Sequence, residues 1–373
     1  MNKDVGKTIK AIAFYLPQFH PIPENNDWWG RGFTEWNNVV KGKPRFKNHY
    51  QPHLPEELGF YDLRLEETRL AQEMLAKEYG IHGFCYYHYW FSGKRLLNEP
   101  IDRKLKNPNE DLPFMLCWAN ENWTKVWDGG ENEILIKQDY SKEDDLKHFN
   151  HLLKYFRDDR YIKIDDKPVF LIYRPKLFPD INKTIEIWRK EALKNDFKGL
   201  HLGYVQSWGV YDIPESMGFD FGVEFHPFSK SKVNLNFSKK INHFFLKAYN
   251  KLFSTYSIVI KKRKPDVVRN YWDYALMQMN DTYSKNISPC LTPMWDNSAR
   301  RKHGALILKN SSPVYYKKWL NFILNNYPWD KSIEKFLFIN AWNEWAEGNH
   351  LEPCQKWGRA YLEITKECLN NGK

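Results

Sequence analysis

Eight short apolar segments recur along the chain, separated by longer segments in which apolar and polar residues alternate with a helical period. Short apolar runs bounded by polar residues predict buried strands. The expected strands are residues 10–16, 81–89, 113–119, 168–173, 200–206, 219–225, 288–292 and 336–342. Parallel strands joined by helices produce this kind of alternation.

Amphipathic segments between the strands predict an outer layer of helices. We expect helices over residues 62–79, 141–156, 184–197, 313–326 and 355–369, with only a short turn at 213–217 between the fifth and sixth strands. In the first helix, Leu63, Leu70, Met74 and Leu75 share the face that should pack on the strands. The second follows a Ser-x-x-Asp cap at Ser141, and Pro313 stands in the first turn of the fourth.

Eight strands alternating with helices favour an α/β fold, a single (β/α)8 barrel of the TIM type with long βα loops, over a doubly wound sheet. No glycine-rich phosphate loop follows the first strand, which also disfavours the doubly wound sheet. We therefore expect one catalytic domain over residues 1–373, with its chemistry at the C-terminal ends of the strands.

The positive charge of the chain is concentrated in one segment. Residues 230–269 contain eleven Lys and Arg and a single acid, Asp266. This segment therefore accounts for the whole net charge of +10. This distribution predicts a basic helical insertion between the sixth and seventh strands and argues against a nucleic-acid surface. Its apolar spacing followed by Lys261, Lys262, Arg263 and Lys264 suits either peripheral contact with an anionic membrane or an ordinary outer helix with solvated lysines.

Five widely spaced cysteines without a CxxC motif make a disulfide framework or a zinc site unexpected. The chain has no apolar run long enough to span a membrane and no apolar signal core near its beginning. We expect a cytoplasmic protein, with the inner face of the cytoplasmic membrane as an alternative location. We expect no cofactor and no metal, because the histidines lack HxH or HExxH spacing.

The predicted strand ends combine aromatic side chains with amides and carboxylates. Sugars need this combination, because their C–H faces stack on aromatic rings and their hydroxyls pair with planar polar groups. Aromatic residues that only fill the barrel mouth are the alternative. The expected substrate-binding residues are His20, Trp36, Tyr87, His88, Trp90, Trp118, Asn120, Glu121, Trp123, Trp127, Tyr173, Trp208, Glu224, His226, Trp295, Asp296, Asn297, Arg300, Asn343 and Trp345.

Glu344 and Glu347 follow the last strand within the motif Asn-Glu-Trp-Ala-Glu-Gly. Two carboxylates held together can have their pKa values pushed apart, so that one donates a proton while the other accepts one. This pair is the expected catalytic site, of the kind glycosidases use. The alternative is that one of them pairs with Arg300 or Arg301 or caps a helix. Glu35, Glu121 and Glu224 are rival carboxylates.

Four separated motifs, at residues 26–36, 118–123, 295–301 and 343–348, resemble the WbsX family of bacterial surface-polysaccharide loci, often labelled glycosyltransferase. That family is similar to glycoside hydrolase family 99, and the resemblance extends over about residues 11–353. It implies a (β/α)8 barrel and metal-independent, endo-acting, retaining cleavage of α-mannosides.

The resemblance also implies roles for the two glutamates. Glu344 corresponds to the glutamate that deprotonates the sugar 2-hydroxyl, which attacks C1 to give a 1,2-anhydro intermediate. Glu347 corresponds to the acid and base at the glycosidic oxygen. Ala346 stands where family 99 enzymes commonly have histidine.

Three functions follow as hypotheses. The first is an enzyme of O-antigen or capsule metabolism that cleaves or transfers α-mannosyl or α-rhamnosyl bonds in an oligosaccharide, a polysaccharide or a lipid-linked glycan. The second is a glycosyltransferase using a nucleotide sugar, which needs a diphosphate site that the sequence suggests only through Arg300 and Arg301. The third is a non-catalytic glycan-binding barrel.

Overall fold

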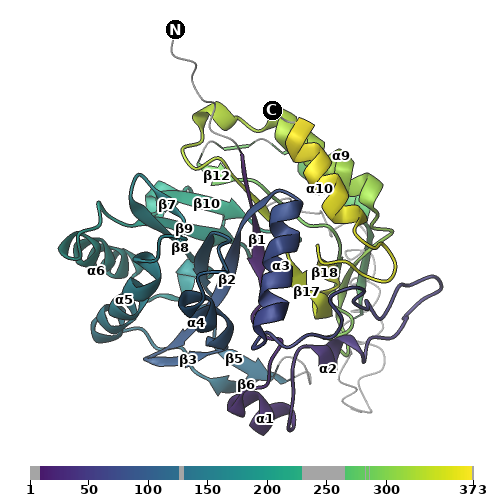
Figure 1. Ribbon diagram of the computed structural model, residues 1–373, viewed down its shortest axis with the longest axis horizontal. Coiled ribbons are helices and arrows are strands. Elements are labelled where there is room, and N and C mark those ends of the chain that lie inside the picture. Colours follow the sequence, from purple (N-terminus) through teal and green to yellow (C-terminus); the bar gives the residue numbers. More distant parts are fainter. Residues whose placement is uncertain (1–8, 126–129, 229–264, 282, 285, 372–373) are drawn as a thin grey trace, which may run out of the picture.

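The computed structural model describes residues 9–125, 130–228, 265–281, 283–284 and 286–371. Nine parallel strands form a sheet that runs from β12 round to β13 (Figure 1). They are β1 (Lys10–Tyr15), β2 (Ile81–Phe91), β4 (Phe114–Trp118), β8 (Lys167–Ile172), β9 (His201–Gln206), β10 (Phe221–Glu224), β12 (Ile287–Ser288), β13 (Cys290–Leu291) and β16 (Phe336–Ile339).

Strands β12 and β13 together close the sheet into a barrel. β12 pairs with β10, and β13 pairs with β16, which in turn pairs with β1. Pro289 separates the two short strands because it has no backbone N–H to donate, although its carbonyl accepts from Phe338 N at 2.9 Å. The predicted (β/α)8 barrel is confirmed. The expected seventh strand is divided into β12 and β13, which together occupy one strand position of the barrel.

Helices cover the outside of the barrel (Figure 1). They are α3 (Glu66–Glu78), α4 (Glu99–Lys106), α5 (Lys142–Phe156), α6 (Ile181–Lys194), α8 (Tyr271–Met279), α9 (Pro313–Asn326) and α10 (Ala360–Asn371), with the short helix η3 (Pro214–Met217) between β9 and β10. The α9 bounds match the prediction, and Ser141 caps α5 by accepting from Asp144 N at 3.1 Å. The pattern missed α4 and α8, and it began α10 five residues too early.

The prediction for α3 is wrong at Met74, which is 65% exposed. The buried face of this helix is largely polar and carries Arg69 and Glu73. Arg69 pairs with Glu110 at 2.8 Å, and Glu73 pairs with Lys104 at 2.5 Å. Buried ion pairs replace part of the apolar contact between α3 and the barrel. The spacing of hydrophobic residues alone therefore predicted the wrong buried face for this helix.

Long loops after the strands carry the smaller elements that surround the C-terminal end of the barrel. These are α1 (Pro23–Trp29), α2 (Trp36–Val39), β5 (Trp123–Lys125), β6 (Gly130–Ile136), β14 (Trp295–Asp296), β15 (Leu306–Lys309), β17 (Asn343–Glu344), η5 (Trp345–Glu347) and β18 (Asn349–His350). The predicted long βα loops are therefore present, and they position the candidate site.

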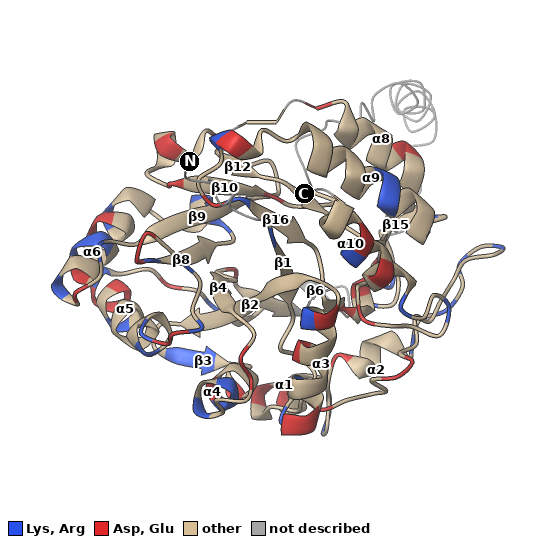
Figure 2. Cartoon of the chain, turned by 45° about the horizontal axis from the view of Figure 1, so that its top comes forward, with Lys and Arg blue, Asp and Glu red and all other residues tan. Residues whose placement is uncertain are grey.

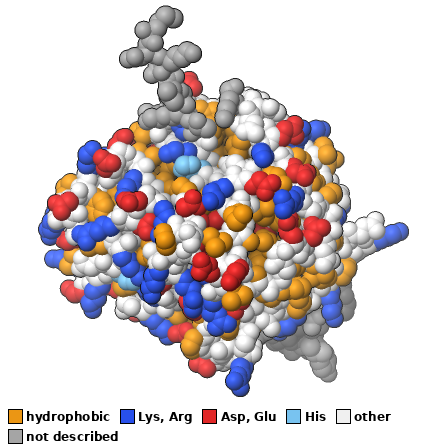
Figure 3. Space-filling view, in the orientation of Figure 1, with side chains coloured by type: hydrophobic (Ala, Val, Ile, Leu, Met, Phe, Trp, Pro, Cys, Tyr) orange, Lys and Arg blue, Asp and Glu red, His pale blue; other side chains and the backbone are white. Residues whose placement is uncertain are grey.

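Most of the predicted basic insertion, residues 230–264 with Lys261 to Lys264, lies outside the described residues. The described end of that segment includes β11 (Val267–Asn270), which pairs with β15. On the face seen in Figure 3, Lys and Arg are interspersed with Asp and Glu. Within the described ranges, no helix is long and apolar enough to cross a membrane.

The buried ion pair below α3 makes a stability prediction. Lys104→Ala leaves the buried Glu73 carboxylate without its cation, so we expect a loss of about 3–5 kcal/mol in the free energy of unfolding. The control is Lys190→Ala, which breaks an exposed pair with Glu186 and should cost about 0.5 kcal/mol or less. Urea unfolding followed by circular dichroism measures both, and similar losses for the two variants would contradict the structural role of the buried pair.

Candidate active site

The motif Asn-Glu-Trp-Ala-Glu-Gly forms the hairpin β17–η5–β18 directly after the last barrel strand. Asn343 binds the end of β1, since its side chain accepts from Leu16 N at 2.7 Å and donates to Leu16 O at 3.0 Å. Trp345 donates to Glu352 at 2.6 Å. Gly348 has a φ of 53°, and a Cβ there would lie 3.0 Å from that of Asp296. These contacts leave Glu344 and Glu347 at the mouth of the barrel.

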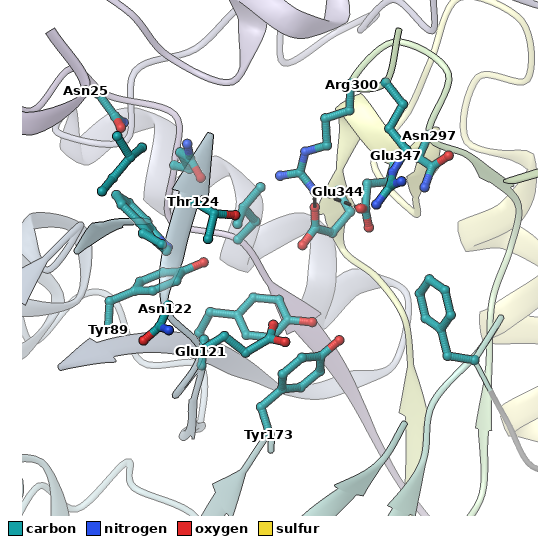
Figure 4. A pocket seen from close by; sticks show the side chains of 18 of the residues that line it. Asn25, Tyr89, Glu121, Asn122, Thr124, Tyr173, Asn297, Arg300, Glu344 and Glu347 are labelled. Carbon is teal, nitrogen blue, oxygen red and sulfur yellow. Dashed lines mark ion pairs between the residues drawn. The ribbon is translucent and has the colours of Figure 1, made fainter. Parts of the chain in front are cut away.

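Arg300 contacts three glutamates, of which Glu344 and Glu347 are seen beside it in Figure 4. Its Nη1 is 2.8 Å from Glu347 Oε1 and 3.8 Å from Glu344 Oε2, and its Nε is 3.0 Å from Glu35 Oε1. Glu35 is fully buried, and the Glu344 side chain is 7% exposed. A glutamate of the motif therefore does pair with Arg300, as the alternative hypothesis predicted. The close partner is Glu347, whereas Glu344 lies farther from the guanidinium group.

The pKa values of two of these glutamates are raised. Burial and the nearby charge of Glu347 hold the pKa of Glu344 well above its ordinary value, although Arg300 opposes the shift. Burial raises the pKa of Glu35 for the same reason, again against the attraction of Arg300. Oε2 of Glu344 is buried and has no hydrogen-bond partner among the described residues. One arginine thus offsets only part of the charge of three carboxylates.

A cavity of about 280 Å³ opens beside this cluster. Ten of the predicted site residues line it: Tyr87, Glu121, Trp123, Tyr173, Trp208, Trp295, Asn297, Arg300, Glu344 and Glu347. The expected site residues did not include Leu16, Gln18, Asn25, Trp28, Trp29, Tyr89, Ala119, Asn122, Thr124, Leu135, Phe225 and Phe228, which also line it. Arg301, expected only as a partner of the glutamates or of a diphosphate, lines it too. Of the remaining predictions, Trp127 lies outside the described residues.

Two groups of aromatic rings, in each of which the rings contact one another, form walls of the cavity. Trp123 contacts Trp28 and Tyr89 with ring centroids 5.5 and 5.4 Å apart. On the other wall Phe228 stacks on Trp208 at 4.6 Å and meets the edge of Trp295 at 5.3 Å. Such walls offer flat apolar faces to a ring-shaped ligand.

Polar groups stand among these rings: Glu121 and Asn122 face the glutamates across the cavity, and Asn297 lies beside Glu347 (Figure 4). Glu121 forms an ion pair with Arg174, whose guanidinium lies 5.6 Å from the ring centroid of Trp208. Asn297 accepts from Leu306 N at 2.8 Å through its carbonyl oxygen, which leaves its amide N–H groups for a ligand. The cavity therefore combines carboxylates, amides and rings.

Several predicted residues point away from the cavity, toward the helices. His88 contacts His148 with their Nε2 atoms 2.8 Å apart, and Trp90 donates to Asp144 at 3.0 Å. Trp118 is buried against Trp188 of α6, with centroids 5.9 Å apart. His226 lies against α8, its Nδ1 2.7 Å from the hydroxyl of Tyr274, and Glu224 accepts weakly from Cys290 N at 3.4 Å.

The other predicted residues that do not line the cavity hold its loops in place. Asn120 binds both backbone groups of Arg174, at 2.8 and 2.9 Å. Trp36 donates to Tyr61 O at 2.8 Å and packs on Trp345. Asp296 accepts from Gln51 and contacts His49, both at 2.6 Å. His20 is buried, and this burial lowers its pKa to about 4.

The alternation of side chains along a strand explains why some of the predicted residues line the cavity and others do not. Successive side chains of a strand point to opposite faces of a sheet. Tyr87 and Tyr89 of β2 therefore reach the cavity while His88 and Trp90 pack under α5. The same rule separates Phe225, in the cavity, from Glu224 and His226. This signal was available in the sequence and would have found Tyr89 and Phe225.

No group of three or more His, Cys, Asp or Glu residues in the described part of the chain is arranged to hold a metal ion. The family model described as "Glycosyltransferase WbsX" matches residues 11–365. The chain belongs to the WbsX family. The resemblance drawn from the four motifs is thereby confirmed.

Two relatives share a large part of this WbsX chain. It is 40% identical over 366 residues to the protein WxcX of Xanthomonas campestris pv. campestris strain B100, and 41% identical over 363 residues to WxcX of strain ATCC 33913. Each alignment covers 96% of this chain and 49% of the relative. The chain thus spans about half the length of the curated relatives it matches.

Solved structures share the fold of this WbsX chain. The family 99 endo-α-mannosidase of Bacteroides thetaiotaomicron in complex with bis-tris-propane gives a TM-score of 0.58 at 12% identity, covering 97% of both chains. A glycoside hydrolase-like protein gives 0.56 at 14% identity, covering 98% of this chain and 95% of its own. These likenesses confirm the barrel.

The raised pKa of Glu344 predicts that this residue destabilises the WbsX chain at neutral and alkaline pH. Above about pH 4.3, the ordinary value for glutamate, the unfolded state loses a proton that folded Glu344 still holds. Stability therefore falls as pH rises toward the folded pKa, by up to about 1.4 kcal/mol per pH unit. Glu344→Gln removes this fall, so the variant should melt at a higher temperature than the unmodified protein at pH 8.

Thermal melts between pH 4 and pH 9 check this prediction. The melting temperatures of the two proteins should approach each other near pH 4. Glu363→Gln, on the exposed side of α10, is the control and should show no such pH-dependent gain. A Glu344→Gln variant that is less stable at pH 8 than at pH 4, relative to the unmodified protein, would contradict a raised pKa.

Proposed function

We propose that this chain is a carbohydrate-active enzyme that cleaves or transfers manno-configured glycosidic bonds, α-mannosyl or α-rhamnosyl, with retention. The observation that carries the proposal is the pair Glu344 and Glu347, both beside Arg300 in an aromatic-walled cavity. The WbsX family and the fold shared with a family 99 mannosidase support it. O-antigen or capsule metabolism is the proposed setting, with an oligosaccharide, polysaccharide or lipid-linked glycan as substrate.

The proposed reaction uses the sugar's own 2-hydroxyl. Glu344 accepts the proton of that hydroxyl while its oxygen attacks C1 and the glycosidic bond breaks. Glu347 gives its proton to the leaving oxygen. Water or an acceptor hydroxyl then opens the 1,2-anhydro ring at C1, losing its proton to Glu347, and the 2-oxygen regains its proton from Glu344. Two inversions at C1 give net retention.

The reaction requires one protonated and one ionised carboxyl group at the start. Burial and the nearby charge of Glu347 raise the pKa of Glu344, which favours the proton on Glu344 in the free protein. The proposed roles therefore require that proton to move to Glu347 before the 2-hydroxyl attacks. A raised pKa also makes Glu344 a stronger base once it is ionised. Arg300 contacts both groups and stabilises whichever of them carries the negative charge.

The same geometry limits the sugar. A 2-oxygen can attack C1 from the rear only if it is trans to the leaving group, which holds for α-manno and α-rhamno sugars. The flat aromatic walls and the amides at Asn297 and Asn122 suit such a ring. A two-carboxylate route through a glycosyl-enzyme ester would not impose this limit.

A nucleotide-sugar-dependent glycosyltransferase is the second candidate. The description of the family model favours it. So does the position of Arg301 beside Arg300 at the cavity, because arginine binds phosphate oxygens in pairs. Membrane contact through Lys261, Lys262, Arg263 and Lys264, and a cytoplasmic location, stay predictions.

Glu344→Gln and Glu347→Gln should each lower turnover by about 10² or more while the fold is retained, because a positioned acid or base contributes about 10²–10⁴ in rate. The substrates are aryl α-mannosides and α-rhamnosides, and circular dichroism checks folding. Glu363→Gln is the matched control and should keep full activity. Near-normal turnover in either active-site variant would remove that residue from the proposed mechanism.

Leaving-group chemistry separates the two roles. A dinitrophenyl leaving group departs without protonation, so Glu347→Gln should recover much of its rate with that substrate. Glu344→Gln should stay inactive with it, because the attacking hydroxyl still needs a base. If Glu344→Gln recovered its rate with this substrate instead, Glu344 would be the acid and Glu347 the base.

Metal removal should leave the activity unchanged. The proposed steps use carboxyl and hydroxyl groups alone and assign no charge neutralisation or water activation to a metal ion. Turnover of the aryl glycosides measured after dialysis against EDTA, and again with added magnesium or manganese, should equal that of the untreated protein within about twofold. A strict requirement for a divalent cation would contradict this mechanism and favour a nucleotide-sugar transferase.

A further inference from the structure

A second cavity, of about 460 Å³, adjoins the glutamate cavity. The two share the side chains of Trp28, Trp29, Arg300 and Arg301. The second cavity is also lined by Lys41, Lys43, Arg45 and Lys302, and no acidic residue lines it among the described ones. A ligand in this second cavity would therefore lie next to Glu344 and Glu347.

Two loops far apart in the sequence supply these cations, and buried polar contacts hold the loops together. Arg45 forms an ion pair with Asp266 at 2.7 Å, and it also donates to the backbone carbonyls of Ser298 and Arg301. The contacts of His49 and Gln51 with Asp296 join the same two loops. The loop after α2 has Lys and Arg but no acid over residues 40–49 (Figure 2).

Gly42 fixes how this loop presents its lysines. Gly42 is buried, and a Cβ on it would come within 2.4 Å of the side-chain oxygen of Gln51. The backbone therefore lies directly against Gln51, while the neighbours Lys41 and Lys43 are exposed at the cavity. A side chain at this position would have to displace the end of the Gln51 side chain, which donates to Asp296.

Charges of one sign at close range repel one another, so a cavity lined by them binds counter-charge well. Arg45 is already paired with Asp266, and Arg300 with the three glutamates. Lys41 and Lys43 form no ion pair with any residue in the described ranges. Arg301 and Lys302 line the same cavity.

We propose that this second cavity binds a phosphate or diphosphate group attached to the sugar substrate. The inference rests on the proposed function, because it places the anionic group beside the sugar that the glutamates act on. Several cations suit a multiply charged group better than a single sugar carboxylate, and arginine and lysine are both phosphate-binding residues. Trp28, Trp29 and Phe33 add an apolar wall for the group that the phosphate carries.

Isothermal titration calorimetry of the whole chain with inorganic pyrophosphate tests the site without requiring catalysis. We expect saturable binding that weakens as salt is raised. Lys41→Ala/Lys43→Ala should weaken it about tenfold or more, because each lysine offers a charge-assisted hydrogen bond. Both lysines are exposed, so the double variant should fold normally. The matched control is Lys142→Ala/Lys147→Ala on α5, which removes the same charge at a distant surface and should bind as the unmodified protein does.

Three further probes identify the group. Tighter binding of GDP than of pyrophosphate supports the site and indicates a nucleotide sugar, whereas tighter binding of geranyl diphosphate supports it and indicates a lipid-linked sugar. Glucuronate should bind at least about tenfold more weakly than pyrophosphate, given its single charge. The proposal is overturned if pyrophosphate does not bind saturably, if the two double variants bind it equally, or if glucuronate binds as tightly.

The outcome is independent of the glycosidase assays. Loss of the proposed activity with intact pyrophosphate binding would reject the reaction and leave the anion site. Cleavage of neutral aryl glycosides without pyrophosphate binding would reject the anion site and leave the reaction.

Discussion

The arrangement of the site depends on one partly buried arginine. Arg300 joins the loop after β14 to Glu35, which precedes α2, and to Glu344 and Glu347 after the last strand. A buried carboxylate is costly unless it is paired or protonated, so the buried Glu35 and Glu344 and the partly exposed Glu347 must share the charge of one arginine. The same cluster therefore fixes three loops in space and holds Glu344 and Glu347 at one guanidinium group.

The barrel was predictable because it depends on short-range patterns. Each buried strand is a short apolar run, and helix starts are marked by the cap Ser141 and by Pro313 in the first turn of α9. The face of α3 was not predictable from these patterns. Its buried side chains Arg69 and Glu73 find partners on other elements, Glu110 and Lys104, and hydropathy does not encode such pairing.

The candidate site was predictable in its location and only partly in its members. Adjacent residues after a strand were treated as one set, although the pleat sends Tyr89 into the cavity and Trp90 to Asp144. The partnership of Glu35 with Arg300 spans most of the chain, and no local period reveals it. The glutamate pair was found because both members belong to one hairpin, where spacing alone brings them together.

The two adjoining cavities are electrostatically linked if the second holds phosphate. Arg300 lines both, and its positive charge opposes the rise in the pKa of Glu344. A bound anion beside Arg300 would offset that charge and raise the proton affinity of Glu344. Since such coupling is reciprocal, a protonated Glu344 would in turn favour the anion. The site would then hold its proton most firmly when a substrate carrying phosphate is in place, which would tie the presence of that proton to the presence of that substrate.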